Sequence, residues 1–246
     1  MQEVTLKQET LDFRSKEAFK TLRTNIEFSG NKIQCVFFTS TIPNEGKSTV
    51  AFETAASFAE SGKKTLFVDA DLRKSVLKNR YKTGRIQFGF SHYLIGKNEL
   101  DDVVCTTNTP NLYLIFAGPV PPNPSELLSG ERFAEFVEEA KREFDFIIID
   151  APPVGSVIDA AIISRQCDGG IMVVGSGETS YRYARKTKEQ LEKAGCKIFG
   201  AVLNKASIGG KGYYGKYYGR YYGKYYGKYY GKYYGNYYGN DEDGGQ

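Results

Sequence analysis

Short apolar runs alternate along the chain with segments of helical periodicity, and this alternation limits the folds that the sequence can form. The runs are rich in β-branched and aromatic residues and show no clean apolar–polar alternation, as expected of strands covered on both faces. The order of runs predicts an α/β domain, a mainly parallel sheet flanked by helices on both faces over residues ~13–204. The predicted strands are residues 33–39, 64–70, 111–118, 144–152, 169–175 and 197–204, and the predicted helices are residues 48–62, 129–144, 157–168 and 180–195.

An amphipathic helix is predicted before the sheet, over Lys16–Phe28, where Phe19, Leu22 and Ile26 recur at helical spacing between charged residues. A further loop and helix are predicted around residues 121–125, with the helix capped near Asn123 or Ser125. Because 41% of the 246 residues are hydrophobic, the chain can bury a substantial core.

The strand and helix pattern stops at Lys205, where a low-complexity tail begins. Seven Tyr-Tyr pairs lie between Tyr213 and Tyr238 and hold 14 of the 19 tyrosines. A glycine follows every pair, which opposes helix formation, and no aliphatic residue follows Ile208 that could anchor the segment in a core. We therefore expect residues 1–204 to form one domain and residues 205–246 to form a disordered C-terminal tail.

The charge, the cysteine spacing and the lack of long apolar runs limit the classes of protein to which the chain can belong. Basic and acidic residues balance at 26 each over residues 1–204, so the formal net charge of +4 comes from the tail and is too small to argue by itself for nucleic acid or anionic lipid. The four cysteines show no C-x-x-C pairing and are interpreted as reduced, mostly buried thiols of a cytoplasmic protein. The N-terminus has no apolar signal core, and no apolar run approaches the ~18 residues that a membrane span requires.

The first predicted strand runs into STIPNEGKST and then into a helix, which is nearly a phosphate-binding P-loop. In such a loop the backbone N–H groups cradle phosphates, Lys47 reaches the β and γ oxygens and the Ser48 hydroxyl binds magnesium. Thr41 stands where the motif has its first glycine, but the helix N-terminus supplies anion-binding donors whatever that residue is. The alternative is a chance G-K-S-T at a strand end.

Carboxylates follow two further strands. KTLFVDADLRKS delivers Asp69 and Asp71 at the carboxyl end of a strand, where ligands of open α/β sheets bind. FDFIIIDAPPV ends in Asp150, which fits a Walker B carboxylate that holds magnesium through water. Aspartates at strand ends are also common helix caps, and this alternative is stronger for Asp71 than for Asp69. The three carboxylates and the loop predict one metal–nucleotide site.

With these motifs the chain resembles the bacterial P-loop tyrosine kinases, close to the cytoplasmic kinase component of capsular or exopolysaccharide synthesis systems in Gram-positive bacteria. TSTIPNEGKST corresponds to Walker A, LFVDADLRKS to Walker A′, FIIIDAPPV to Walker B and AGPVPPNPSELL to the loop that precedes a helix near the nucleotide. The terminal tyrosine cluster completes the set. The H-R-D and D-F-G signatures of eukaryotic-type kinases are absent from the sequence.

The resemblance implies a P-loop NTPase fold, ATP and Mg²⁺ as cofactors, and a set of site residues. The implied catalytic residues are Lys47, Asp69, Asp71 and Asp150, the implied metal ligands are Ser48, Asp69 and Asp150, and the implied nucleotide-binding residues are Pro43, Asn44, Glu45, Gly46, Lys47, Ser48 and Thr49, with Asn204 at the adenine edge. Asp69 is favoured over Asp71 as the residue that orients the phenol and takes its proton, although the residues themselves leave this choice open. Asn204 is equally a common turn residue.

The tail is interpreted as the kinase's own substrate, because glycine after each pair leaves the backbone supple enough to present each ring to a narrow site. The family resemblance implies that the transfer occurs in trans between subunits. The predicted phosphoacceptors are Tyr213, Tyr214, Tyr217, Tyr218, Tyr221, Tyr222, Tyr225, Tyr226, Tyr229, Tyr230, Tyr233, Tyr234, Tyr237 and Tyr238. Two alternatives stay open: a Tyr-Gly-Lys module that stacks on bases or self-associates, and a regulatory ATPase that acts by nucleotide-driven assembly.

Two residues, one in the loop and one in the first helix, depart from the family pattern, and a third separates the chain from a related branch. Asn44 stands where the family often has glycine, and Ile42 stands where the related cell-division ATPases have a second lysine, which argues against that branch. The oligomerisation motif E-x-x-R-x-x-R is represented by Glu17, Lys20 and Arg23, with lysine in place of the first arginine. Lysine cannot make the bidentate carboxylate contact of arginine, which weakens the inference of a ring-like homo-oligomer that the resemblance implies. The alternative is that these residues form a solvated face of the helix.

The resemblance also implies partners and a location. A transmembrane adaptor and activator of the polysaccharide co-polymerase type is expected, which would recruit a cytoplasmic kinase to the inner face of the cell membrane. A cognate tyrosine phosphatase is expected as well, and no nucleic acid partner.

Overall fold

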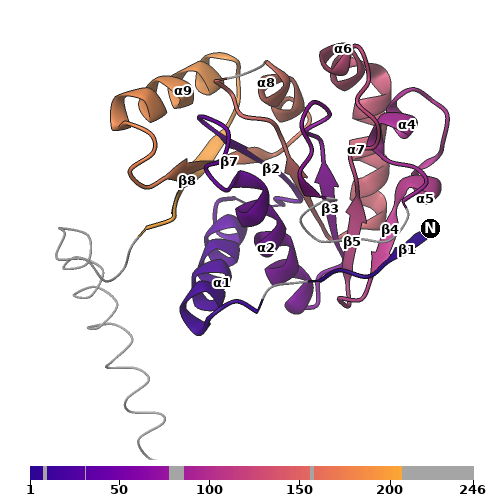
Figure 1. The fold of residues 1–246 in the computed structure, drawn as a ribbon, viewed down its shortest axis with the longest axis horizontal. Coiled ribbons are helices and arrows are strands. Elements are labelled where there is room, and N and C mark those ends of the chain that lie inside the picture. Colours follow the sequence, from indigo (N-terminus) through magenta and orange to yellow (C-terminus); the bar gives the residue numbers. More distant parts are fainter. Residues whose placement is uncertain (8–9, 31, 78–85, 156–157, 207–246) are drawn as a thin grey trace, which may run out of the picture. The chain divides into compact units, whose positions relative to one another are not determined.

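The computed structural model describes residues 1–7, 10–30, 32–77, 86–155 and 158–206. Met1–Lys205 form one compact unit, in which the described strands make an eight-stranded sheet (Figure 1). In chain order the strands are β1 (Gln2–Val4), β2 (Cys35–Ser40), β3 (Thr65–Asp69), β4 (Cys105–Thr107), β5 (Leu112–Ile115), β6 (Phe146–Asp150), β7 (Gly169–Gly175) and β8 (Ile198–Asn204).

The strand order across the sheet is β1-β4-β5-β3-β6-β2-β7-β8. All neighbouring pairs are parallel except β4 and β5, which confirms the predicted α/β class with a mainly parallel sheet. The crossovers bring the carboxyl ends of β3, β6 and β2 side by side, and Asp69 pairs in register with Asp150. The topology therefore creates one edge at which ligands of such sheets bind.

Helices cover both faces of the sheet. The helices are α1 (Phe13–Glu27), α2 (Lys47–Glu60), α4 (Phe90–Leu94), α5 (Leu100–Val103), α6 (Pro124–Ser129), α7 (Glu131–Glu143), α8 (Asp159–Ser164) and α9 (Tyr181–Lys193). Side chains of α2 and Ile26 of α1 pack with Val36, Phe38 and Ile148 on one face, whereas α4, α7 and α8 pack with Phe37 on the other (Figure 1). None of the helices in the described segments is long and apolar enough to cross a membrane.

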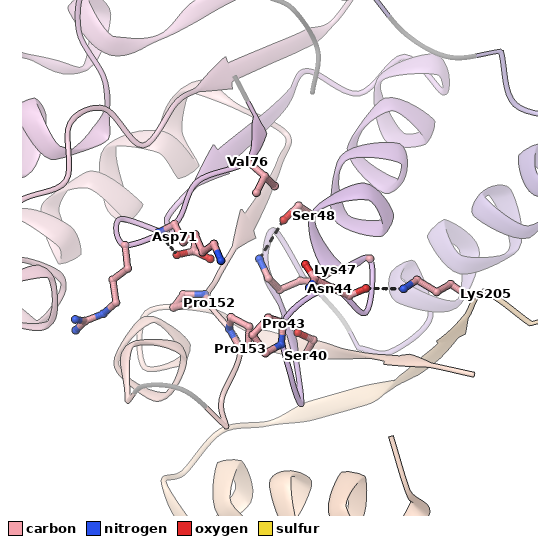
Figure 2. A pocket seen from close by; sticks show the side chains of 13 residues that line it. Ser40, Pro43, Asn44, Lys47, Ser48, Asp71, Val76, Pro152, Pro153 and Lys205 are labelled. Atoms are coloured by element: carbon pink, nitrogen blue, oxygen red, sulfur yellow. Dashed lines mark hydrogen bonds between the residues drawn. The ribbon is translucent and has the colours of Figure 1, made fainter. Parts of the chain in front are cut away.

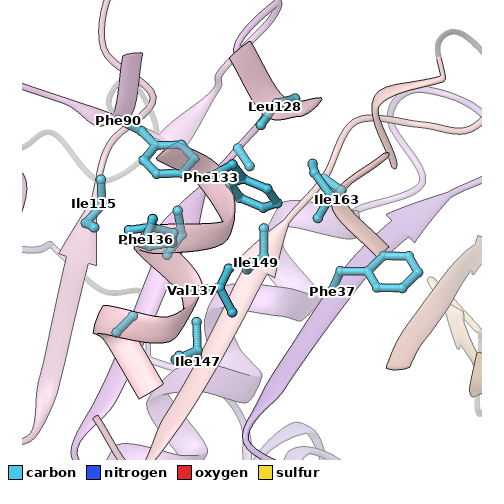
Figure 3. Close-up of a cluster of buried hydrophobic side chains, with 14 of the residues drawn as sticks. Phe37, Phe90, Ile115, Leu128, Phe133, Phe136, Val137, Ile147, Ile149 and Ile163 are labelled. Carbon is cyan, nitrogen blue, oxygen red and sulfur yellow. The ribbon is translucent and has the colours of Figure 1, made fainter. Parts of the chain in front are cut away.

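The core beneath α7 is built from aromatic rings over isoleucines. Phe90 packs edge-to-face against Phe133 and Phe136, which stack on each other, with ring centroids 4.8–6.3 Å apart. Figure 3 shows the three rings over Ile147 and Ile149 of β6. These side chains are almost completely buried, and each buried aromatic or aliphatic side chain stabilises the fold by roughly 1.5–3 kcal/mol relative to exposure. The core holds the central strands, and with them the strand ends, in place.

Each of the six predicted strands is found, but the expectation that strands are covered on both faces is wrong for one of them. Every residue of β2, β3 and β6 is buried, whereas β8 has no buried residue and exposes Ala201 and Leu203. The reason is its position at the edge of the sheet, which periodicity does not report. The short strands β1 and β4 were not predicted, because three residues carry too little pattern.

The predicted helices are confirmed with small shifts. The predicted helix at residues 16–28 is α1, which begins earlier, after the cap at Asp12, and α6 begins after Asn123 as predicted. Helix α8 has only six residues, against the longer helix predicted over residues 157–168. The four cysteines are free thiols, and three of them are buried, as expected.

Asp168 links the start of β2 to the start of β7 and makes the fold sensitive to acid. Its carboxylate accepts hydrogen bonds from the Gln34 and Cys35 amides at 2.8 Å and from Lys141 Nζ at 3.3 Å. Partial burial raises the pKa of Asp168, but the two amides and Lys141 together hold it below its ordinary value. The carboxylate therefore stabilises the fold above its unfolded pKa of ~3.9, and this contribution is lost as the pH falls through the lower folded-state value.

We expect Asp168→Asn to lower the free energy of unfolding by about 1 kcal/mol at pH 7, after allowance for solvent screening, and by much less near pH 3. Urea denaturation at the two pH values measures the difference. Glu189→Gln, which removes an exposed ion pair with Arg185, is the control and should change stability by less than ~0.5 kcal/mol at either pH. An equal loss at both pH values would contradict the electrostatic origin.

Candidate active site

The loop between β2 and α2 turns sharply because two of its residues adopt left-handed backbone conformations. Asn44 has a φ of 70° and Gly46, the N-cap of α2, has a φ of 86°. A Cβ on Gly46 would lie 2.1 Å from the Asn204 amide nitrogen, so glycine is required both by the conformation and by the close approach. The turn leaves the N-terminus of α2 facing the edge of the sheet, where free N–H groups favour an anion.

A cavity of about 500 Å³ opens beside this loop (Figure 2). It brings together the loop, the segment after β3, the two prolines after Asp150 and the residue after β8. The lining residues are Ser40, Pro43, Asn44, Gly46, Lys47, Ser48, Asp71, Arg73, Lys74, Val76, Pro152, Pro153 and Lys205. Four of them are lysine or arginine against a single aspartate, so the cavity suits an anionic ligand.

Lys47 and Asp150 form a buried ion pair in the centre of the site. The Lys47 side chain is 7% exposed and that of Asp150 is 2% exposed, and Lys47 Nζ also lies 3.2 Å from Ser48 Oγ. Burial raises the pKa of the Asp150 carboxyl, whereas the neighbouring Lys47 ammonium opposes this rise. Breaking a buried ion pair by removing one partner is costly, because the remaining charge has no compensation.

Asp69 and Asp71 occupy different positions although they are two residues apart. Asp69 is buried at the end of β3, and its carboxylate accepts hydrogen bonds from Ser75 Oγ and, at 3.2 Å, from the Asp71 amide. Burial, followed by the charge of Asp150, raises the pKa of Asp69 to about 7. Asp71 lines the cavity, and its carboxylate also accepts a hydrogen bond from the Lys74 amide at 3.0 Å. The cavity therefore presents Asp71, with Asp69 beneath it.

The Glu45 side chain is buried and braces the loop from within. One carboxylate oxygen accepts the Thr41 and Ile42 amides at 2.7 and 2.9 Å, and the other accepts the Gly175 amide at 2.9 Å and Thr179 Oγ1 at 2.7 Å. The carboxylate thus joins the first turn of the loop to the end of β7. Glu45 was predicted as a nucleotide-binding residue through the loop backbone; its side chain is engaged inside the protein, and the role of its backbone stays a prediction.

A second ionic cluster at the rim was not predicted from the sequence. Arg73 donates through Nε to the buried Asp159 at 2.7 Å and through Nη2 to Ser125 Oγ at 2.8 Å, and Ser125 Oγ lies 2.6 Å from Asp159 Oδ1. The cluster joins the segment after β3 to the first turns of α6 and α8. These residues are 34 to 86 positions apart in the chain, so local pattern carried no signal for them.

The other predicted site residues have diverse positions. Of the residues predicted to bind nucleotide, Pro43, Asn44, Gly46, Lys47 and Ser48 line the cavity, whereas Thr49 and Asn204 are not in its lining. Their role as nucleotide ligands stays a prediction. The Asn204 side-chain amide donates to the Glu45 carbonyl at 2.9 Å, so it supports the loop. The predicted phosphoacceptors, from Tyr213 to Tyr238, lie outside the described residues.

The three predicted oligomerisation residues make contacts within the chain. Glu17 and Lys20 form an ion pair at 2.7 Å on the surface of α1. Arg23 Nη1 donates to the Ser57 carbonyl of α2 at 2.6 Å, which fastens α1 to its neighbour. Their role between subunits stays a prediction.

Comparisons with known proteins agree with this geometry. A family model described as AAA domain matches residues 44–174. Tyrosine-protein kinase CpsD of Streptococcus agalactiae is 44% identical over 209 residues, which cover 82% of this chain and 91% of the relative. The kinase domain of Escherichia coli tyrosine kinase ETK superposes with a TM-score of 0.76 at 32% identity, over 84% of this chain and 85% of that chain. The crystal structure of the chimerical protein CapA2B2 matches with a TM-score of 0.74 at 31% identity, over 84% and 94% of the two chains.

The match to CpsD extends over nearly the whole length of the relative, and the strand ends and the phosphate loop that carry the resemblance meet in one cavity. The chain therefore belongs to the bacterial P-loop tyrosine-protein kinases.

Proposed function

We propose that this kinase transfers the γ-phosphoryl group of ATP to the tyrosines of its own C-terminal tail, in trans between subunits. The observation that carries the proposal is that Lys47, Asp71 and the N-terminus of α2 meet in one cavity. Phosphoryl transfer depends mainly on positioning and on charge neutralisation, and these groups supply both. The phenol that accepts the phosphoryl group comes from the residues Tyr213–Tyr238.

The donors around the cavity fit Mg²⁺. Asp69 and Asp150 pair in register and are both buried, and the charge of Asp150 contributes to the raised pKa of Asp69, so a divalent cation beside them would relieve that repulsion. Ser48 and these two carboxylates are the oxygen ligands that we assign to the ion, because Mg²⁺ at nucleotide sites uses one or two carboxylates together with substrate phosphates. When bound, Mg²⁺ neutralises charge on the transferring phosphates.

Two carboxylates are available to orient the tyrosine hydroxyl and to accept its proton. Asp71 lines the cavity, whereas Asp69 is buried at the end of β3 and is the residue that the family resemblance favours as proton acceptor. A tyrosine hydroxyl titrates near pH 10, so the proton leaves late, when the phosphorus has become electrophilic. Single Asp69→Asn and Asp71→Asn variants separate the two roles.

The biological setting follows the family. We propose that the kinase regulates capsule or exopolysaccharide synthesis or export, that a transmembrane adaptor of the polysaccharide co-polymerase type activates it at the inner face of the cell membrane, and that a tyrosine phosphatase reverses the modification. Each phosphate adds about −1.5 to −2 charges, so three phosphotyrosines make the basic tail acidic. This change would weaken a homo-oligomer held through Glu17, Lys20 and Arg23 of α1.

The proposal is tested by incubating the purified protein with ATP and Mg²⁺ and measuring phosphate on residues 213–238 by mass spectrometry. We expect successive additions of phosphate and none in a variant with all fourteen tail tyrosines changed to phenylalanine. To test transfer in trans, this tail variant is mixed with a Lys47→Met protein whose tail is intact. Phosphate on the Lys47→Met protein is the expected result.

Two outcomes would overturn parts of the proposal. If phosphate never reaches the Lys47→Met protein, transfer occurs within one chain. If ATP is hydrolysed while the tail stays unmodified, even with a peptide from an adaptor present, the protein is a regulatory ATPase instead.

A further inference from the structure

We propose that Lys205 is a positioning residue of the phosphate loop. Its ammonium group donates to the Asn44 carbonyl at 2.6 Å and pairs with Glu178 Oε1 at 2.7 Å (Figure 2 shows the first contact). Lys205 follows the last residue of β8, whereas Asn44 lies in the loop after β2, 161 positions earlier in the chain. The backbone of Lys205 has a φ of 58°, in the left-handed region, at the point from which its side chain reaches the loop.

The hydrogen bond from Lys205 to the Asn44 carbonyl fixes the orientation of the Asn44–Glu45 peptide in the phosphate loop. In a trans peptide the C=O and the next N–H point in opposite directions, so a bond that holds the Asn44 carbonyl also sets the direction of the Glu45 N–H. Asn204, the preceding residue, donates to the Glu45 carbonyl at 2.9 Å and sets the Gly46 N–H in the same way. Two successive residues at the end of β8 therefore orient two successive peptide planes of the loop.

Orientation of these N–H groups matters because a phosphate loop binds anions through its backbone donors. Asn44 sits in the left-handed region, which few residues other than glycine adopt, and the Lys205 contact helps to hold it there. The side chains of Lys205 and Glu178 are 41% and 39% exposed, so their ion pair by itself contributes little to the stability of the fold. The contact therefore acts on the loop and not on the fold as a whole.

This inference rests on the proposal that ATP binds in the cavity, which Lys205 also lines. The competing role is direct binding of a phosphate by the Lys205 ammonium. Replacing Glu178 distinguishes the two roles, because they predict opposite changes in nucleotide affinity. If Lys205 positions the loop, loss of Glu178 releases the ammonium and weakens nucleotide binding, whereas if Lys205 binds phosphate directly, loss of Glu178 frees it from a competing anion and tightens binding.

The test measures ADP affinity by isothermal titration calorimetry on the full chain. We expect Lys205→Met to weaken binding about tenfold and Glu178→Gln about threefold, with the double variant no weaker than Lys205→Met. Lys205→Arg keeps a donor within reach of Asn44 and should retain most of the affinity. Lys188→Met, which also breaks an exposed lysine–glutamate pair, is the matched control and should bind ADP like the wild type.

Steady-state kinetics and thermal unfolding distinguish a positioning role of Lys205 from a merely structural one, which would lower the melting temperature. We expect Lys205→Met to raise the KM for ATP with kcat within about twofold and with an unchanged melting temperature of the nucleotide-free protein. Tighter binding in Glu178→Gln, unchanged binding in Lys205→Met, or a matching fall in melting temperature would each overturn the inference. If Lys47→Met binds ADP like the wild type, the nucleotide site itself is wrongly assigned, and the proposed function fails independently of Lys205.

Discussion

Replacing Lys47 with methionine is expected to reduce the rate of tyrosine phosphorylation by about two to three orders of magnitude or more. Removing one preorganised charge from a phosphoryl-transfer site has effects of this size, because the developing negative charge loses a fixed partner in a site that excludes water. Lys47 begins α2, lines the cavity and is almost completely buried, so solvent cannot replace its ammonium group. Transfer of labelled phosphate from ATP to the tail measures the loss.

The control must separate lost chemistry from lost stability, because Lys47→Met also leaves Asp150 as an unpaired buried carboxylate. The double variant Lys47→Met with Asp150→Asn removes that charge, so we expect it to regain thermal stability while remaining inactive. Lys63→Met, at an exposed position after α2, should be fully active. A Lys47→Met protein that folds and phosphorylates at more than a tenth of the wild-type rate would show that Lys47 is not central to transfer.

Gly46→Ala is expected to weaken nucleotide binding by about a hundredfold. A Cβ at this position meets the Asn204 amide nitrogen at 2.1 Å, and alanine in the left-handed region adds roughly 1–2 kcal/mol of strain. Relief of the clash moves Asn204 away from the Glu45 carbonyl or shifts the loop, and either change disturbs the N-terminus of α2. Calorimetric titration with ADP measures the effect directly.

The chain offers a matched control for this variant. Gly62 has a φ of 91° but no atom within 4 Å of an added Cβ, so Gly62→Ala carries the same backbone strain without the clash. We expect Gly62→Ala to lower stability by roughly 1 kcal/mol and to leave ADP affinity unchanged. If Gly46→Ala and Gly62→Ala have the same affinity for ADP, the contact between Gly46 and Asn204 is irrelevant to binding.

The local sequence pattern predicted the elements that are determined by residues close together in the chain. Strands β2, β3 and β6 carry three or four consecutive apolar residues, and their burial in the centre of the sheet is what such runs indicate. The edge position of β8 and the three-residue strands β1 and β4 depend on neighbours that are distant in sequence, and periodicity says nothing about them.

By itself, the sequence determined the class of chemistry. The G-K-S-T turn, the carboxylates at two strand ends and the tyrosine repeat are contiguous motifs, and a contiguous motif keeps its meaning wherever the strand lies in the sheet. These motifs indicate the kinase family without any knowledge of tertiary contacts, and the comparisons confirm that family.

Only the tertiary structure decided how the site is held. It turned Glu45 inward to join the loop to β7, left Asp71 facing the cavity with Asp69 beneath it, and brought Lys205 to the loop from the far end of the domain. The physical reason is that each of these side chains can form hydrogen bonds or ion pairs with many different polar groups. Which partner it contacts depends on strand order and crossover, and these follow from burial of the whole sheet and not from any short stretch of residues.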